Sequence, residues 1–138
     1  MSGTDDPREE LEQRIRDGRA SRDAVEKAIG LWRRTLRNGV SLASGELARI
    51  EMRDLYHLLC DNRIARKPWR IGRLLSNVFE IRTAKEGRRI GYSRWDEEGE
   101  TRAGYVILEA NNRVRSMHLI LENRLQRMRT KGAVLWTR

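Results

Sequence analysis

Residues 101–121 have the sequence TRAGYVILEANNRVRSMHLIL. Residues 101–109 and residues 113–121 are each predicted to form a β-strand, with side chains that alternate between the two faces of the sheet. Asn111 and Asn112 lie between the two runs, and asparagine tolerates the positive φ that a tight hairpin turn requires. The stretch therefore predicts an antiparallel hairpin.

A two-residue turn determines which residues of this hairpin face each other. The predicted partners are Tyr105 with His118, Ile107 with Ser116, Glu109 with Val114, and Ala110 with Arg113. Successive side chains point to opposite faces of a strand, so one face is apolar and is expected to pack on the rest of the protein. That face holds Val106, Leu108, Met117 and Leu119. The opposite face is expected to stay open and holds Tyr105, Ile107, Glu109, Val114, Ser116 and His118.

Other strands and helices follow from the spacing of apolar residues on either side of Asn77. After it, strands are predicted over residues 78–83, 89–95 and 133–137, while residues 123–131 fit either a helix or a loop. Before it, helices are predicted over residues 7–18, 21–36 and 44–60, with a short helix that begins at Pro68. Ser44 is the expected N-cap of the helix over residues 44–60.

Helices followed by a run of antiparallel strands are typical of an α+β fold. We expect the N-terminal helices to cover one face of a four- or five-stranded antiparallel sheet formed by residues 78–137. Residues 1–40 are predicted to be a helical extension, disordered over residues 1–7, and residues 41–138 to be the α+β domain.

The charge of the chain indicates a polyanionic partner. It has 29 Lys+Arg against 20 Asp+Glu, a net charge of +9. The excess is +1 over residues 1–37, +3 over residues 38–78 and +5 over residues 79–138. A basic domain rich in arginine suits nucleic acid, so RNA (or DNA) is expected to bind through the C-terminal half. The alternative is a general preference for arginine at the surface, with no ligand.

Composition also limits the classes of function. The single cysteine, Cys60, allows no internal disulfide, which favours a cytoplasmic protein. No Cys/His cluster has the spacing of a metal site and no cofactor-binding motif is present, so neither a metal nor a cofactor is expected. No signal peptide or apolar run of membrane-spanning length is present, so no membrane association is expected.

RNA cleavage without a metal needs a base for the 2′-OH proton, an acid for the leaving 5′-oxygen and a cation for the transition state. Histidine titrates near neutrality and suits either proton-transfer role. His118, on the open face of the hairpin, is the first catalytic candidate, and His57 is the second. The alternative is that both are structural.

Arginines on or beside the predicted strands are candidates for contacts with phosphate. Arg82, Arg88 and Arg94 are expected to stabilise the scissile phosphate. Further nucleic-acid contacts are predicted for Arg89, Arg113, Arg115, Arg124, Arg127 and Arg129. Trp95 adjoins the acidic loop over residues 96–100 and is expected to be exposed enough to stack on a base.

Parts of this sequence resemble the RelE-like and barnase-like ribonuclease superfamily. ELAR at 46–49, LYH at 55–57 and LLSNVFEI at 74–81 are similar to the entry from helix to first strand in phage-borne toxin members. YVIL at 105–108 and MHLI at 117–120 are similar to the central hairpin. The resemblance covers about residues 44–137. It implies a ribonuclease on a twisted antiparallel sheet, with His57, Arg82, Arg94 and His118 as its catalytic residues.

Three hypotheses of function remain open at this point. The first is a metal-independent endoribonuclease of toxin or mobile-element type. The second is a non-catalytic, basic nucleic-acid-binding accessory protein of a mobile element or defence system. The third is a structural interaction subunit, in which the apolar stripe of the helix over residues 21–37 binds a protein partner or a second copy of the chain.

Overall fold

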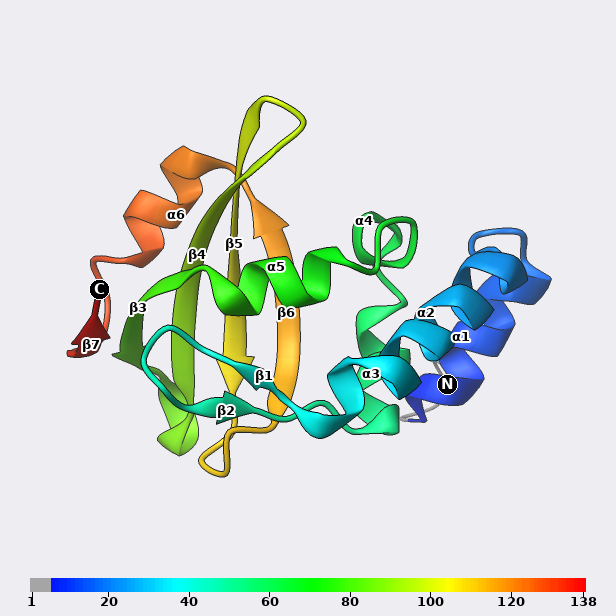
Figure 1. Ribbon diagram of the computed structural model, residues 1–138, viewed down its shortest axis with the longest axis horizontal. Coiled ribbons are helices and arrows are strands. Elements are labelled where there is room, and N and C mark those ends of the chain that lie inside the picture. Colours follow the sequence, from blue (N-terminus) through cyan, green and yellow to red (C-terminus); the bar gives the residue numbers. More distant parts are fainter. Residues whose placement is uncertain (1–5) are drawn as a thin grey trace.

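The computed structural model describes residues 6–138, in which most helices precede a five-stranded sheet (Figure 1). The elements in chain order are α1 Pro7–Arg16, α2 Arg22–Arg34, η1 Leu36–Asn38, β1 Val40–Ser41, β2 Leu47–Ala48, α3 Met52–Leu58, α4 Asn62–Ala65, α5 Arg70–Ser76, β3 Val78–Thr83, η2 Lys85–Gly87, β4 Arg89–Glu97, β5 Glu100–Leu108, β6 Val114–Ile120, α6 Glu122–Met128 and β7 Val134–Thr137. Of the predicted disordered start, residues 1–5 lie outside the described residues, and Pro7 begins α1.

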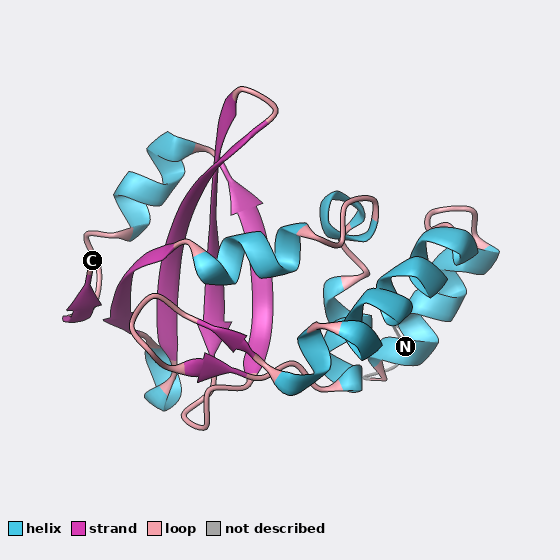
Figure 2. Ribbon diagram, viewed as in Figure 1, coloured by secondary structure: helices cyan, strands magenta, loops and turns pink. Residues whose placement is uncertain are grey.

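Five strands form one antiparallel sheet in the order β6-β5-β4-β3-β7 (Figure 2). The predicted α+β fold with a five-stranded antiparallel sheet is therefore confirmed. β4 and β5 pair without interruption from Arg89–Leu108 to Glu97–Glu100, and their turn extends beyond the neighbouring strands in Figure 2. β6 is an edge strand, and its position at the edge determines where a ligand can approach.

The hairpin over residues 101–121 has the predicted pairing except near its turn. Tyr105 pairs with His118, and Ile107 pairs with Ser116. A β-bulge then places Val114 opposite Leu108 instead of Glu109, so that Val114 turns to the apolar face and is fully buried. The prediction that Val114 lies on the open face is therefore wrong. In the turn, Asn112 takes a positive φ of 68°.

Helix α5 packs across one face of the sheet (Figure 1). Ile71, Leu74 and Leu75 are buried in the same cluster as the hairpin residues Val106, Leu108, Met117 and Leu119. Gly104 permits this close packing. A Cβ at that position would lie 2.6 Å from Leu74 Cδ1 and 2.7 Å from the His118 carbonyl oxygen. The contact between α5 and β5 therefore requires glycine at position 104.

Helix α6 covers part of the opposite face. Leu125 is buried together with Ile90, Tyr92 and Ala103, and this apolar contact explains why residues 122–128 form a helix rather than a loop. The Tyr92 hydroxyl donates a hydrogen bond to the Met128 carbonyl at 3.1 Å. The part of this face on β5 and β6 remains partly exposed.

The prediction of a helix over residues 44–60 is wrong in its first half. Ser44 and Gly45 form the turn between β1 and β2 instead of a helix N-terminus, because Gly45 has a φ of 93° that no helix accommodates. α3 begins after Glu51, where Glu51 and Asp54 form a reciprocal capping box. The short β1–β2 hairpin therefore replaces the first turns of the predicted helix.

The N-terminal helices share their buried side chains with the rest of the protein. Leu11, Val25 and Ala28 belong to the same core cluster as α5 and the sheet. Trp32 Nε1 donates to the Ile50 carbonyl at 2.7 Å and so links α2 to the start of α3. The domain boundary at residue 40 and the partner surface over residues 21–37 stay predictions. Over residues 6–138, no helix combines the length and hydropathy needed to cross a membrane.

Two glycine substitutions are expected to change stability in opposite directions. Gly104→Ala should lower the free energy of unfolding by about 1–3 kcal/mol, because the added methyl overpacks the contact with α5. Gly72→Ala lies inside α5, where the added Cβ would make an ordinary contact with Leu36 Cδ2 at 4.0 Å, and should raise the free energy of unfolding by up to about 1 kcal/mol. Urea denaturation of both variants measures these changes in the free energy of unfolding. If the two substitutions changed the free energy of unfolding equally, the close contact between α5 and β5 at Gly104 would be contradicted.

Candidate active site at the edge strand

A row of polar side chains crosses the second face of the sheet. The strand register places Glu80, Tyr92, Tyr105 and His118 next to one another on β3, β4, β5 and β6. Glu80 and Tyr92 are buried, whereas Tyr105 and His118 are partly exposed. The ring centroids of His118 and Tyr105 lie 5.3 Å apart. The row is therefore accessible at its His118 end, on the edge strand.

His118 is influenced by charged groups from three other parts of the chain. Burial lowers the pKa of His118 below the usual value of 6.5, Asp61 raises it, and Arg63, His57 and Arg124 lower it. His57 belongs to α3, Arg63 to α4 and Arg124 to α6. The fold thus brings both candidate histidines into one electrostatic neighbourhood. A neutral imidazole at pH 7 can accept a proton, as a general base must.

Arg63 is a candidate that the sequence analysis missed. Its guanidinium donates to the Leu119 carbonyl at 3.1 Å and forms an ion pair with Asp61 at 3.3 Å. These contacts hold a cation against the edge strand, beside the residue that follows His118. Residues 62–73, NRIARKPWRIGR, contain five cations and no acidic side chain. This run, called the basic segment below, is the sequence signal that could have identified Arg63.

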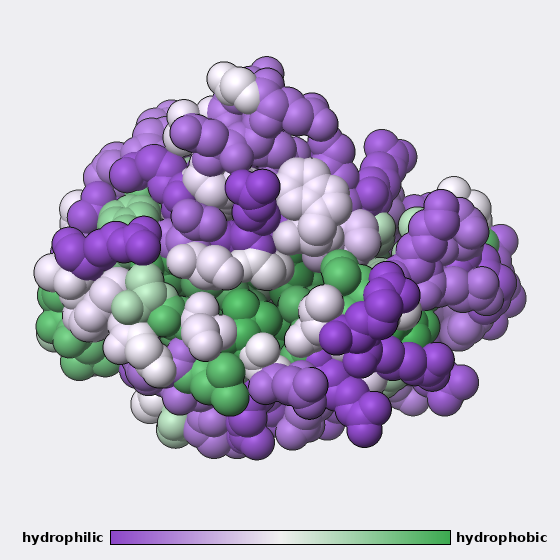
Figure 3. All heavy atoms as spheres, in the orientation of Figure 1, coloured by the Kyte–Doolittle hydropathy of each residue, from purple (hydrophilic) through white to green (hydrophobic). Residues whose placement is uncertain are grey.

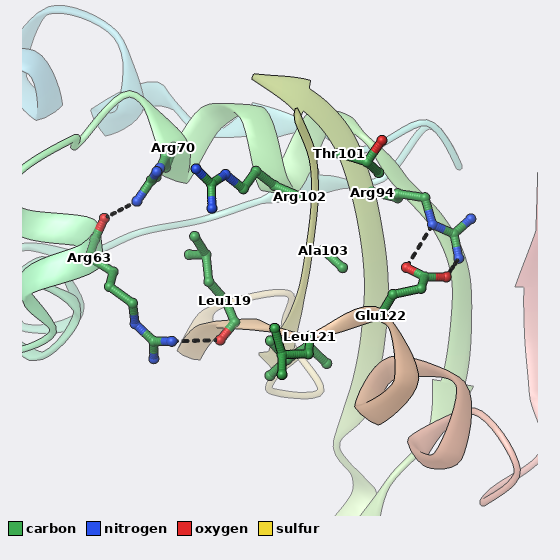
Figure 4. A pocket seen from close by; sticks show the side chains of 10 residues that line it. Arg63, Arg70, Arg94, Thr101, Arg102, Ala103, Leu119, Leu121 and Glu122 are labelled. Carbon is green, nitrogen blue, oxygen red and sulfur yellow. Dashed lines mark hydrogen bonds and ion pairs between the residues drawn. The ribbon is translucent and has the colours of Figure 1, made fainter. Parts of the chain in front are cut away.

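A buried ion pair attaches the basic segment to the sheet. The Arg70 guanidinium donates to Glu97, with Nη2 2.6 Å from Oε1. Trp95 and Lys67 donate to the same carboxylate, and these contacts, that of Arg70 above all, lower the pKa of Glu97 to about 2. Arg70 Nη1 donates to the Arg63 carbonyl at 2.9 Å (Figure 4). Glu97 therefore positions Arg63 through Arg70.

A pocket of about 550 Å³ opens beside these arginines. Figure 4 shows the guanidinium groups of Arg63, Arg70, Arg94 and Arg102 around it, with Leu121 between them. The carboxylates that pair with these four arginines are Asp61, Glu97, Glu122 and Glu100. An anion that enters the pocket can contact more than one guanidinium group, in competition with these carboxylates.

Most of the predicted phosphate-binding arginines are engaged by carboxylates. The pairs are Arg82 and Arg129 with Glu80, Arg94 with Glu122, Arg88 with Glu86 and Glu109, Arg115 with Glu109, Arg89 with Glu46, and Arg113 with Asp54. Arg124 and Arg127 have no ion pair within residues 6–138 and are exposed on α6. A phosphate must compete with a carboxylate at each paired arginine, so the unpaired ones are more available.

The strand order separates the backbones of the two predicted catalytic arginines from β6, although the Arg94 side chain lines the same pocket as Arg63. Arg82 lies on β3, three strand spacings from β6, which is roughly 14 Å. Arg94 lies on β4, two spacings or roughly 10 Å away. The Phe79 ring lies within cation–π distance of the Arg94 guanidinium, at 4.8 Å. Arg63 and Arg124 are the arginines whose charges lower the pKa of His118.

The prediction for Trp95 is wrong. β4 continues through Glu97 instead of ending before an acidic loop, and Trp95 points into the core with 4% of its surface exposed. Its Nε1 donates to Glu97 at 3.2 Å. Trp95 therefore cannot stack on a base. Trp69, in the basic segment, is the tryptophan with a large exposed surface, at 41%.

Within residues 6–138, no group of three His, Cys, Asp or Glu side chains is arranged to hold a metal ion. Comparison with family models, curated proteins and solved structures found no match to this chain. The resemblance to RelE-like and barnase-like ribonucleases therefore stays a prediction.

Substitution of Glu97 is expected to destabilise the protein strongly. Glu97→Gln leaves the buried Arg70 charge without its counter-ion, and should lower the free energy of unfolding by about 3–5 kcal/mol at pH 7. The folded state lowers the pKa of Glu97 from 4.5 to about 2, so its contribution is present above pH 4.5 and is lost as pH falls toward 2.

Denaturation curves recorded from pH 7 to pH 2 measure this contribution. The difference between wild type and Glu97→Gln should shrink as the pH falls. Glu100→Gln removes an exposed partner of Arg102 and is the matched control, expected to change stability by less than about 1 kcal/mol. A similar small effect of Glu97→Gln would show that the buried ion pair is dispensable.

Proposed function

We propose that the protein is a metal-independent endoribonuclease whose active site lies at β6, with His118 and His57 as its proton-transfer residues. The observation that carries this proposal is the placement of both histidines of the chain, together with Arg63, in one neighbourhood beside an edge strand. Metal-free RNA cleavage needs these types of residue. The basic charge of the chain and the pocket lined by arginines support an RNA substrate.

The proposed reaction uses the 2′-OH of RNA as the nucleophile. Neutral His118 takes the 2′-OH proton while the 2′-oxygen attacks phosphorus and the bond from phosphorus to the 5′-oxygen breaks. Protonated His57 gives a proton to the leaving 5′-oxygen, and the Arg63 guanidinium stabilises the charge on the transition state. The products are a 2′,3′-cyclic phosphate and a 5′-hydroxyl. Proton transfer back from His118 to His57 through water restores the enzyme.

The second candidate function is nucleic-acid binding without cleavage. It is favoured by the ion pairs of Arg82 and Arg94, which the resemblance to ribonucleases had placed at the scissile phosphate. In this case the arginines hold RNA or DNA and the histidines are structural. Binding that weakens as salt rises, with no cleavage, distinguishes this function from the first. The absence of any binding at low salt would favour the third hypothesis, a structural subunit.

The cleavage proposal is tested with a synthetic single-stranded RNA in the presence of a metal chelator. His118→Ala should lower the cleavage rate by about 10²–10⁴-fold, because it removes the general base. Ser116→Ala, on the same face of the same strand, is the matched control and should keep the wild-type rate. An all-deoxy oligonucleotide should not be cut, since it has no 2′-OH. A wild type that is inactive without Mg²⁺ would overturn the mechanism.

The pH dependence of cleavage is a separate test of the role of His118. As a base, His118 must be neutral, so the rate rises with pH as this residue loses its proton. Because burial lowers its pKa, the midpoint of that rise should lie below pH 6.5. Single-turnover rates measured from pH 4.5 to pH 8 give the profile. A rise centred above pH 6.5, or one that His118→Ala retains, would exclude His118 as the base.

A further inference from the structure

Trp69 presents an aromatic surface that the core does not use. It lies immediately before α5 with 41% of its surface exposed. The guanidinium groups of Arg73 and Arg70 lie 5.9 Å and 6.0 Å from its ring centroid. Trp32 and Trp95 donate their indole N–H groups to protein acceptors, whereas the Trp69 indole makes no hydrogen bond within residues 6–138. Within residues 6–138 the indole N–H of Trp69 is therefore free to donate to a ligand, and part of its ring is exposed beside the two guanidinium groups.

A groove of about 340 Å³ adjoins this ring. Its other lining residues are small or apolar, and come from α2, η1, β1 and α5: Leu31, Thr35, Leu36, Gly39, Val40 and Gly72. Figure 3 shows hydrophobic surface exposed across this side of the molecule, with strongly hydrophilic side chains around it. The groove can accept a flat, largely apolar group beside an aromatic ring.

The surroundings of the groove are strongly basic. On the side of the basic segment, a second pocket of about 220 Å³ is lined by Asn62, Arg63, Arg66, Lys67 and Arg70. On the opposite side, α2 and η1 carry Arg33, Arg34 and Arg37, all exposed. Within residues 6–138, Arg66, Arg73 and these three arginines form no ion pair with a carboxylate. These cations are therefore available to an anionic ligand.

We infer that the groove beside Trp69 binds an unpaired nucleobase of single-stranded RNA, while the basic segment holds the adjoining phosphates. The inference rests on the proposed function in taking RNA as the ligand. A flat ring stacks on Trp69, and the pocket that Arg66 lines lies next to it along the same segment. Arg66 is the cation of this pocket that forms no ion pair within residues 6–138. Alternating base and phosphate sites match the repeat of a nucleic-acid strand.

The position of Arg63 connects this subsite to the proposed active site. Arg63 lines both the pocket on the basic segment and the larger pocket at the end of the sheet. It also contacts β6 next to His118. An RNA strand bound at Trp69 can therefore continue past Arg63 to the edge strand. Duplex RNA does not fit this route, because its bases are stacked on one another and cannot reach the ring of Trp69.

The test measures binding of a labelled 2′-O-methyl RNA of about 12 nucleotides, which cannot be cleaved by the proposed reaction. Trp69→Leu keeps an apolar side chain but removes the ring, and should weaken single-strand binding by about tenfold while leaving duplex binding unchanged. Trp69→Phe should retain most of the affinity. Leu135→Ala replaces another exposed apolar residue, on β7, and is the control that should bind as the wild type does.

Two further measurements test base stacking on Trp69 and phosphate binding by the basic segment independently of Trp69→Leu. RNA should quench the tryptophan fluorescence of the wild type, and Trp69→Phe should lose most of that quenching. Arg66→Ala should reduce the slope of log affinity against log salt by about 0.7, as expected for one phosphate contact on a single strand.

The outcomes separate this inference from the proposed function. If Trp69→Leu binds RNA as tightly as the wild type, the subsite is wrong even where His118-dependent cleavage is observed. If the wild type cleaves no RNA but loses affinity in Trp69→Leu, the subsite stands and the endoribonuclease proposal fails. If RNA does not bind, and an acidic peptide binds in a manner that depends on Trp69, the groove is a protein-docking site and the inference is overturned.

Discussion

The carboxylate of Glu97 determines how the two halves of the protein fit together. It is almost completely withdrawn from water, which is costly unless every oxygen receives hydrogen bonds. Arg70, Lys67 and Trp95 supply them, so that β4 is joined to α5 and to the loop before it. Arg70 in turn holds the Arg63 carbonyl, and Arg63 reaches the edge strand. The cation held against the edge strand is thus positioned by a carboxylate at the C-terminal end of β4.

Buried carboxylates also explain why the distribution of net charge along the sequence does not identify the arginines that are available to a nucleic acid. The excess of arginine is greatest after residue 78, yet Glu80 alone engages Arg82 and Arg129, and Asp54 engages Arg113. Arginine satisfies a carboxylate and a phosphate with the same planar donors, so the sequence does not reveal which of them it will meet. Two of the arginines that form no ion pair within residues 6–138, Arg66 and Arg73, lie in the basic segment, whose own sequence contains no acidic side chain.

The parts of the fold that were predictable depend on short-range patterns. A two-residue turn at Asn111 and Asn112 between two predicted strands was sufficient for the hairpin and for the pairing of Tyr105 with His118. The bulge that buries Val114 was not predictable, because it depends on packing against distant residues. The same holds for Trp95, which is buried because Glu97 accepts its indole N–H. The electrostatic influence of His57 on His118 depends on how α3 packs beside β6, a contact between residues far apart in sequence.

An edge strand exposes unpaired backbone groups and invites pairing with another chain. Arg63 reduces this hazard at β6 by donating to the Leu119 carbonyl, and its charge discourages the approach of another strand. The same position gives a ligand access, because α5 covers one face of the sheet while His118 lies on the other. A strand of RNA that contacts both Trp69 and His118 has to pass around an edge, and β6 is the edge next to the basic segment. Arg63 therefore hinders pairing of β6 with another chain and, in the proposed complex, contacts the RNA where it passes from Trp69 to His118.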